Sequence, residues 1–168
     1  EEATSLYEGA REKIAKFINA ASSREVIYTR NTTESITLVA YSWARANLKA
    51  GDLVILTEME HHSDDLPFRA VAQVAHVAVD AQGRLDEADF DRLLRQHQGK
   101  VRLVAVTGAS NVTGYLNPLH RLAEKAHAAG ALFLADCAQL APHRTVDMRD
   151  LADPGHLDFV VLSAHKMY

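Results

Sequence analysis

The sequence contains few of the residues that mark secreted, multidomain or membrane-spanning proteins. Only one cysteine, Cys137, occurs in 168 residues. No disulfide can therefore form within the chain, and we expect a cytoplasmic protein. The 4 prolines and 8 glycines do not gather into a linker, which favours one domain or part of one. The longest apolar runs, such as Leu53–Leu56, are far shorter than the roughly 20 residues of a membrane helix.

An excess of either charge is also missing. The chain has 18 Lys and Arg against 22 Asp and Glu, for a formal net charge of −4. No strong basic field favours nucleic acid or an anionic membrane, so we expect neither as a partner. The sequence also has no G-x-G-x-x-G or G-x-x-x-x-G-K loop, which excludes the usual dinucleotide-binding and Walker-type phosphate sites.

Helical patterns alternate with short apolar runs along the whole chain. Apolar residues between Leu6 and Ile18 fall at helical spacing, residues 25–29 are rich in strand formers, and Asn31–Glu34 can cap a second helix that continues to Trp43. The pattern predicts further strands at 53–56, 75–79, 101–107, 131–135 and 157–163, and helices near 67–73, 86–96 and 119–129. This order is typical of an α/β protein with a largely parallel sheet sandwiched by helices.

Polar residues follow the predicted strands. In parallel sheets, ligands bind at the loops that follow the strand ends, so we expect these residues to share one site. The five sets are Thr32–Glu34, Glu58–His62, Ser110–Gly114, Asp136–Gln139 and Ser163–Lys166.

The order and spacing of these sets resemble a known family. The motifs are T-R-N-T-T-E-S-I, E-M-E-H-H-S-D-D-L-P, A-S-N-V-T-G, D-C-A-Q and S-A-H-K-M-Y, between about Glu8 and Tyr168. They resemble class V aminotransferase-type enzymes of the fold-type I pyridoxal 5'-phosphate (PLP) group, and particularly SufS-like cysteine desulfurases. The resemblance implies that residues 1–168 are part of a large PLP-binding domain, with an N-terminal segment and a small C-terminal domain missing.

The resemblance assigns catalytic roles to Lys166 and His61. Lys166 would hold PLP as a Schiff base, whereas the simplest alternative is an exposed surface lysine. His61 would stack on the cofactor ring and move protons, because an imidazole is planar and titrates near neutral pH. The neighbouring His62 would be structural. We expect no metal site, because neither H-E-x-x-H nor a Cys/His cluster is present.

The same resemblance assigns cofactor-binding roles around the pyridine ring. Asp136 would keep the ring nitrogen protonated, Gln139 would hydrogen-bond the ring hydroxyl oxygen, and Asn111 would lie near the cofactor and the substrate carboxylate. The alternatives are local: Asp136 and Gln139 can serve ordinary turns, and Asn111 can form the turn before Gly114.

The phosphate would be held by hydroxyl groups and a helix terminus. Thr33 and Thr32 lie at a predicted helix N-terminus, where free N–H groups and the helix dipole favour anions. Ser163 and His165 complete the set that the resemblance implies. Simple helix capping is the alternative for the two threonines, and one geometry can serve both purposes.

The function that the resemblance implies is sulfur removal from L-cysteine, with an amino-acid substrate, a homodimer and a sulfur-acceptor protein. SufS-like enzymes commonly carry Gly where this chain has Asn31, Cys137 and Ala164. These departures keep other activities open, namely an aminotransferase, an epimerase or another lyase, or a non-catalytic PLP-fold module. Cys137 adjoins Asp136, so we expect a buried, inert thiol and not the sulfur-accepting nucleophile.

Overall fold

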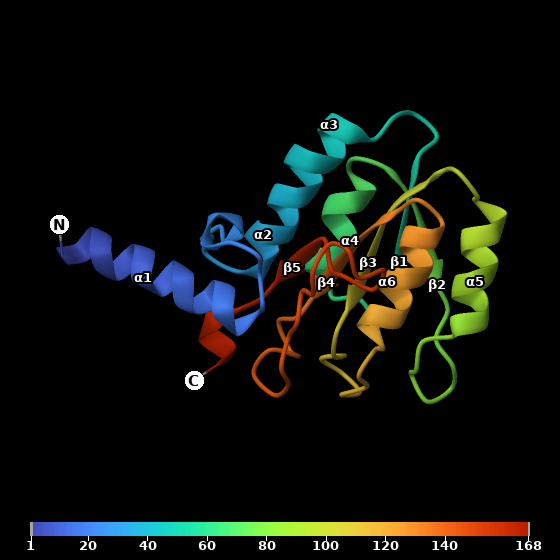
Figure 1. Ribbon diagram of the computed structural model, residues 1–168. Helices are drawn as coiled ribbons and strands as arrows, with labels where there is room; N and C mark the ends of the chain where they lie inside the picture. Colours follow the sequence, from blue (N-terminus) through green and yellow to red (C-terminus); the bar gives the residue numbers. More distant parts are fainter. Residues whose placement is uncertain (1, 168) are drawn as a thin grey trace.

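Five parallel strands form one sheet in the computed structural model, which describes residues 2–167. The strand order is β2-β1-β3-β4-β5, and every neighbouring pair is parallel (Figure 1). The strands are β1 (Leu53–Thr57), β2 (Gln73–Val77), β3 (Val101–Thr107), β4 (Leu132–Asp136) and β5 (Phe159–Val161). The predicted α/β architecture with a parallel sheet is confirmed.

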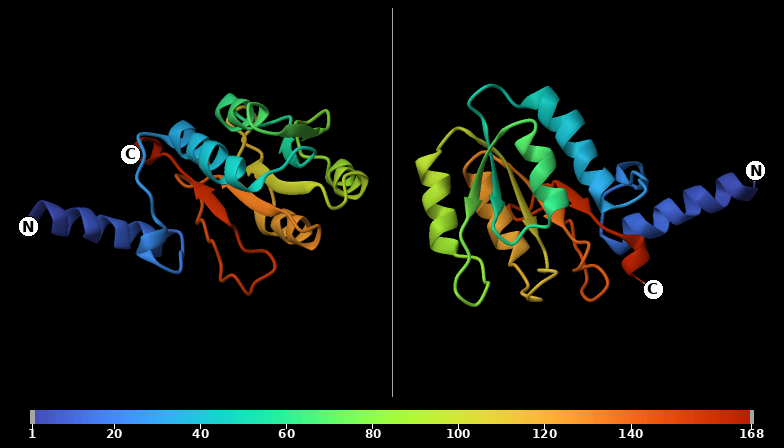
Figure 2. Two further views of the ribbon diagram at one scale, coloured as in Figure 1. Left: turned by 90° about the horizontal axis from the view of Figure 1, so that it is seen from above. Right: turned by 180° about the vertical axis from the view of Figure 1, so that it is seen from behind.

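Helices cover both faces of the sheet. Helices α2 and α4 lie on one face and α5 and α6 on the other, so the molecule has three layers (Figure 2). The bounds are α1 (Glu2–Phe17), α2 (Thr32–Leu38), α3 (Arg45–Asn47), α4 (His62–Arg69), α5 (Glu87–Gln96) and α6 (Leu119–Ala128). The π-helical segment η2 (Val39–Ala44) joins α2 to α3, and two short 3-10 helices are η1 (Ser23–Glu25) and η3 (Ala164–Lys166).

Each face of the sheet has its own apolar core. Ile36 of α2 and Phe68 of α4 pack in one core, and Phe90 of α5 and Leu122 of α6 pack in the other. Successive strand side chains point to opposite faces, so a central strand supplies both cores. All five residues of β1 are buried, which explains its uninterrupted apolar sequence.

The local signals at helix ends act as expected. The Asn31 side chain accepts the Glu34 N–H at 2.9 Å and caps α2. The Asp86 side chain accepts the Ala88 and Asp89 N–H groups and caps α5. Gly130 follows α6 with φ of 81°, the left-handed conformation that ends helices at glycine.

The predicted strand at residues 25–29 is wrong. The Ser22 side chain accepts the Arg24 N–H, and this contact starts η1. The chain then runs in an irregular conformation to α2, with Val26 buried and Ile27 68% exposed. A strand forms only where a neighbouring strand pairs with it, so the high strand propensity of these residues is not sufficient here.

The predicted helix at 67–73 begins and ends too late. Helix α4 starts at His62 because His61 caps it, with Nδ1 accepting the Ser63 N–H at 3.2 Å. Pro67 therefore lies inside the helix. The chain leaves α4 early enough for β2 to begin at Gln73, two residues before the predicted start at residue 75.

Helix α1 extends away from the body of the molecule (Figures 1 and 2). Ala15 is its one buried residue among those described. Within residues 2–167, no helix combines the length and apolar character needed to cross a membrane.

Candidate active site

The direction of strand order changes between β1 and β3. The chain passes from β1 to β2 on one side and then returns to build β3, β4 and β5 on the other. Ligands of open α/β sheets bind in the crevice beyond the carboxyl ends of the strands at such a point. The polar residues that follow these strands are therefore brought to one edge of the sheet.

Asp136 is the buried carboxylate of this edge. It ends β4 and is 5% exposed, and its Oδ1 accepts the Ala138 N–H at 2.8 Å. Burial raises the pKa of Asp136, while the Ala138 hydrogen bond and the positive charges of Lys166 and His61 oppose this shift. Three residues from three separate sequence motifs thus interact electrostatically at one place.

Thr32 and Ser163 join the start of α2 to the segment after β5. Their hydroxyl oxygens lie 2.6 Å apart, and both side chains are buried. Thr33, in contrast, is exposed at the same helix start. The structure therefore pairs Thr32, and not Thr33, with Ser163.

His61 lies at the junction between β1 and α4. Its Nδ1 is 2.7 Å from the Ser63 Oγ and also accepts the Ser63 N–H. The cap fixes the orientation of the imidazole and leaves Nε2 for another partner. His62 is the first residue of α4 and is exposed.

The remaining predicted cofactor residues lie on short connecting segments. His165 and Lys166 belong to η3 and are exposed, Gln139 lies half-buried in the turn after β4, and Asn111 is exposed in the turn after β3. That last turn is formed by Ser110, whose Oγ accepts the Val112 and Thr113 N–H groups. The assigned roles of these side chains stay predictions.

A buried carboxyl pair at the same edge was not predicted. The Glu60 Oε1 accepts the Thr57 Oγ1–H at 2.6 Å and the Thr107 N–H at 3.0 Å, and so bridges the ends of β1 and β3. Asp64, on the first turn of α4, is completely buried. The Glu60 Oε2 and both Asp64 carboxyl oxygens have no hydrogen-bond partner in the described part of the chain.

Burial shifts both of these groups toward the neutral form. It raises the pKa of Glu60 to about 7, and it raises the pKa of Asp64 well above the ordinary range, with the Glu60 charge adding to the second shift. The carboxyls are four residues apart in the sequence, with Glu60 just before α4 and Asp64 in its first turn. Spacing alone did not reveal their burial, because it equally fits a solvated helix face.

Cys137 is completely buried, as predicted. Burial, and then the charge of Asp136, raises the pKa of this thiol. A nucleophilic cysteine needs an accessible thiolate, so Cys137 is unsuited to accept sulfur from a substrate.

The chain belongs to the class V aminotransferase family, because the sequence profile described as "Aminotransferase class-V" matches residues 1–168. A protein of Synechocystis named "Probable cysteine desulfurase" is 48% identical over 170 residues, covering 98% of this chain and 39% of that protein. A "Cysteine desulfurase" of Pectobacterium atrosepticum is 45% identical over 172 residues, covering 99% and 40%.

Solved structures of cysteine desulfurases also match the fold over nearly the whole chain. The cysteine desulfurase CsdA from Escherichia coli matches with a TM-score of 0.84 and 36% identity, covering 97% of this chain and 40% of that one. A cysteine desulfurase from Thermococcus onnurineus matches with a TM-score of 0.87 and 33% identity, covering 99% and 40%. The chain thus spans about 40% of the length of these relatives.

Proposed function

We propose that this chain is the cofactor-binding part of a PLP-dependent enzyme that removes sulfur from L-cysteine. The observation that supports the proposal is the buried carboxylate of Asp136 at the end of β4, within electrostatic reach of Lys166 and of His61. Relatives named cysteine desulfurase, at 45–48% identity over nearly the whole chain, support this activity over others of the family.

The residues at this edge fit PLP by their chemistry. A buried carboxylate suits a protonated pyridine nitrogen, a lysine amine suits the aldehyde, and hydroxyl groups beside a helix start suit the phosphate. Asp136, Lys166 and the Thr32–Ser163 pair supply these groups. When bound, PLP would supply an electron sink for the charge that develops at the substrate Cα.

The chain's own residues would position groups and hold protons. Asp136 keeps one oxygen on the Ala138 N–H, which fixes the carboxylate and leaves its other oxygen for the ring nitrogen. His61 is oriented through Nδ1, so Nε2 can face the ring or exchange a proton. The Lys166 amine lies on η3, within electrostatic reach of Asp136, and can take a proton from the substrate Cα.

We further propose a cytoplasmic homodimer that passes sulfur to an acceptor protein. The single, buried cysteine suits a reducing compartment, and the family resemblance implies the dimer. A desulfurase needs an accessible cysteine, and Cys137 does not meet this requirement. The sulfur-accepting cysteine of the proposed enzyme is therefore a residue other than Cys137.

Two measurements on the full-length protein test the proposal. Borohydride reduction of the PLP-loaded enzyme followed by peptide mapping should give a cofactor adduct at Lys166, and an adduct elsewhere would reject the site. Sulfide release from L-cysteine under reducing conditions should then be measured. An adduct at Lys166 without sulfide release would favour an aminotransferase, epimerase or other lyase, consistent with the departures at Asn31, Cys137 and Ala164.

A further inference from the structure

We infer that His127, His156 and Asp158 form a binding site for one divalent transition-metal ion, such as Zn²⁺. One ligand atom from each of the three lies within 4.8 Å of the other two. The His127 Nε2 is 2.8 Å from the Asp158 Oδ2, and the His156 Nε2 is 3.3 Å from the Asp158 Oδ1. This inference does not depend on the proposed function.

The site lies at the opposite end of the sheet from Asp136. Asp158 directly precedes β5, whose other end pairs with Asp136 in the parallel register. His127 comes from the last turn of α6, and His156 from the loop that leads into β5. An ion here would tie a helix, a loop and the edge strand together without touching the candidate active site.

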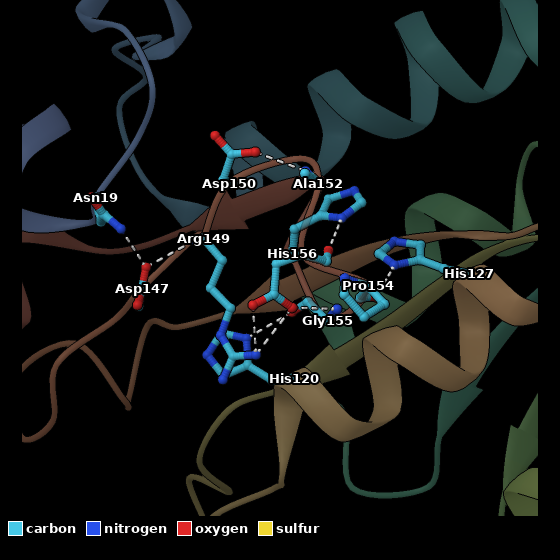
Figure 3. Close-up of polar contacts among 11 residues, drawn as sticks. Asn19, His120, His127, Asp147, Arg149, Asp150, Ala152, Pro154, Gly155 and His156 are labelled. Carbon is cyan, nitrogen blue, oxygen red and sulfur yellow. Dashed lines mark hydrogen bonds and ion pairs between the residues drawn. The ribbon is translucent and has the colours of Figure 1, made fainter.

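The hydrogen bonds of both imidazoles are those of metal ligands. The His127 Nδ1 is 2.7 Å from the Pro154 carbonyl oxygen, and the His156 Nδ1 is 2.7 Å from the Asp153 carbonyl oxygen (Figure 3). A carbonyl only accepts, so each Nδ1 must carry the hydrogen. Metal-binding histidines characteristically donate their other ring N–H to a carbonyl or carboxylate in this way.

This assignment leaves the two Nε2 atoms facing a carboxylate. In neutral imidazoles whose Nδ1 carries the hydrogen, Nε2 presents a lone pair. Two lone pairs opposite carboxylate oxygens need positive charge between them. The two rings stack with 4.1 Å between their centroids, so both lone pairs lie beside the one carboxylate. One divalent cation between these atoms supplies the charge.

The ligand set and the distances match a four-coordinate ion. Imidazole and carboxylate groups bind Zn²⁺ at about 2.0–2.2 Å, which places nitrogen and oxygen ligands about 3.3 Å apart at a tetrahedral angle. The His156–Asp158 distance already has this value. The His127–Asp158 distance must open by about half an ångström, and the stacked rings, inclined at 18°, must tilt until both Nε2 lone pairs point at the ion.

The surroundings hold the ligands in place and leave them accessible. The Asp158 Oδ2 also accepts the Phe133 N–H at 2.7 Å. The loop carbonyls that orient the rings are fixed by Asp153, whose Oδ1 accepts the Gly155 N–H and pairs with Arg149 (Figure 3). The three ligand side chains are 13–16% exposed, so an ion can enter from solvent.

Metal titration of the full-length protein tests the site. After treatment with a chelator, Zn²⁺ binding is measured by calorimetry and Co²⁺ binding by its visible absorption bands. The key variant is His156→Ala, because it leaves the contact between His127 and Asp158 intact. The matched control is His143→Ala, which removes an exposed histidine elsewhere. Thermal unfolding with and without Zn²⁺ provides a second measurement.

We expect one Zn²⁺ equivalent to bind wild type and His143→Ala with equal affinity, and to raise their unfolding temperature. His156→Ala should bind this equivalent at least about tenfold more weakly and lose the temperature increase. Binding that is unchanged in His156→Ala would place the ion elsewhere and overturn the inference. A wild type that binds neither ion would overturn it equally.

Discussion

Asp64 is placed where its charged form is unfavourable. Its pKa is raised well above the usual range, first by burial and then by the Glu60 charge. The folded state therefore retains a proton that the unfolded chain releases near pH 4. The contribution of Asp64 to the free energy of unfolding is fully present below pH 4 and is lost as pH rises toward the folded pKa. A carboxylate in an ion pair shows the opposite dependence, because its contribution is lost as pH falls.

Asp64→Asn should therefore stabilise the protein at alkaline pH. The amide stays neutral at every pH and can donate to the Glu60 Oε2, which otherwise lacks a partner among the described residues. We expect a gain of about 1–2 kcal/mol in the free energy of unfolding at pH 8 and little change at about pH 4, where Asp64 is protonated in the folded state and half-protonated in the unfolded chain. Urea unfolding of the full-length apoprotein at both pH values measures this difference.

Asp65→Asn is the matched control, because the adjacent carboxylate is shifted the other way. Its pKa is lowered by hydrogen bonds from Arg69 and His76, against an opposing effect of partial burial. The control should lose about 0.5–1 kcal/mol at pH 8, since the pair is largely at the surface. If Asp64→Asn also lost stability at pH 8, the account of the buried pair would be wrong.

One pair of hydroxyl groups, those of Thr32 and Ser163, joins α2 to the segment after β5. Ser163→Ala would leave the Thr32 hydroxyl buried and unpaired, so we expect a loss of about 1–3 kcal/mol in stability. Thr32→Val should reduce stability less in the Ser163→Ala variant than it does in the wild type. We expect a coupling energy of about 1 kcal/mol between the two substitutions. Additive effects in this double-mutant cycle would contradict the contact. Thr33→Val, an exposed neighbour, should change stability by less than about 0.5 kcal/mol.

Two glycines, one inside a helix and one just after a helix, should respond to alanine with opposite sign. Gly130 ends α6 with φ of 81°, where a Cβ is strained, so Gly130→Ala should cost about 1 kcal/mol. Gly9 lies inside α1 with no atom within 4 Å of an added Cβ, so Gly9→Ala should gain about 0.5–1 kcal/mol. Urea unfolding of both variants against wild type measures the difference. A loss in both would contradict the helix-propensity argument for Gly9, because an added Cβ meets no atom within 4 Å at either position.

Sequence patterns predicted the elements correctly where a local feature, such as an unbroken apolar run, determines the structure. The bounds of β3 agree with the prediction of residues 101–107, because a central strand buried on both faces needs an unbroken apolar run. The prediction failed at residues 25–29, where strand formation depends on a partner that no local pattern specifies. It also misplaced α4, because His61 is an unusual helix cap and Pro67 suggested a later start.

The candidate site follows the same distinction. The order of the motifs predicted that Lys166, His61 and Asp136 share one site. In the fold Lys166 and His61 each act electrostatically on Asp136, and their shared role stays a prediction. The burial of Asp64 and its pairing with Glu60 depend on how α4 packs against the sheet, which spacing does not specify. Of the ligands proposed for a metal ion, His156 and Asp158 are two residues apart, but His127 lies 31 residues before Asp158, so no ligand-spacing motif marks the set.

At the scale of the whole molecule, the sheet and the proposed cofactor are linked through the strand ends. The site is assembled from the ends of β1, β4 and β5, so a ligand bound there binds only the folded chain and stabilises all of it. Asp136 is the group through which this linkage can be tested, because Asp136→Asn keeps an oxygen for the Ala138 N–H and removes the charge.

We expect Asp136→Asn to weaken PLP binding by about 10–100-fold, since a neutral amide stabilises a protonated ring nitrogen poorly. The stabilisation that PLP gives should then fall by about 1.4–2.7 kcal/mol, seen as a smaller rise in unfolding temperature at the same PLP concentration. Asp150→Asn is the matched control, because this exposed side chain accepts the N–H of Ala152, also two residues ahead. Equal PLP affinity in Asp136→Asn and Asp150→Asn would separate Asp136 from the cofactor and contradict the proposed site.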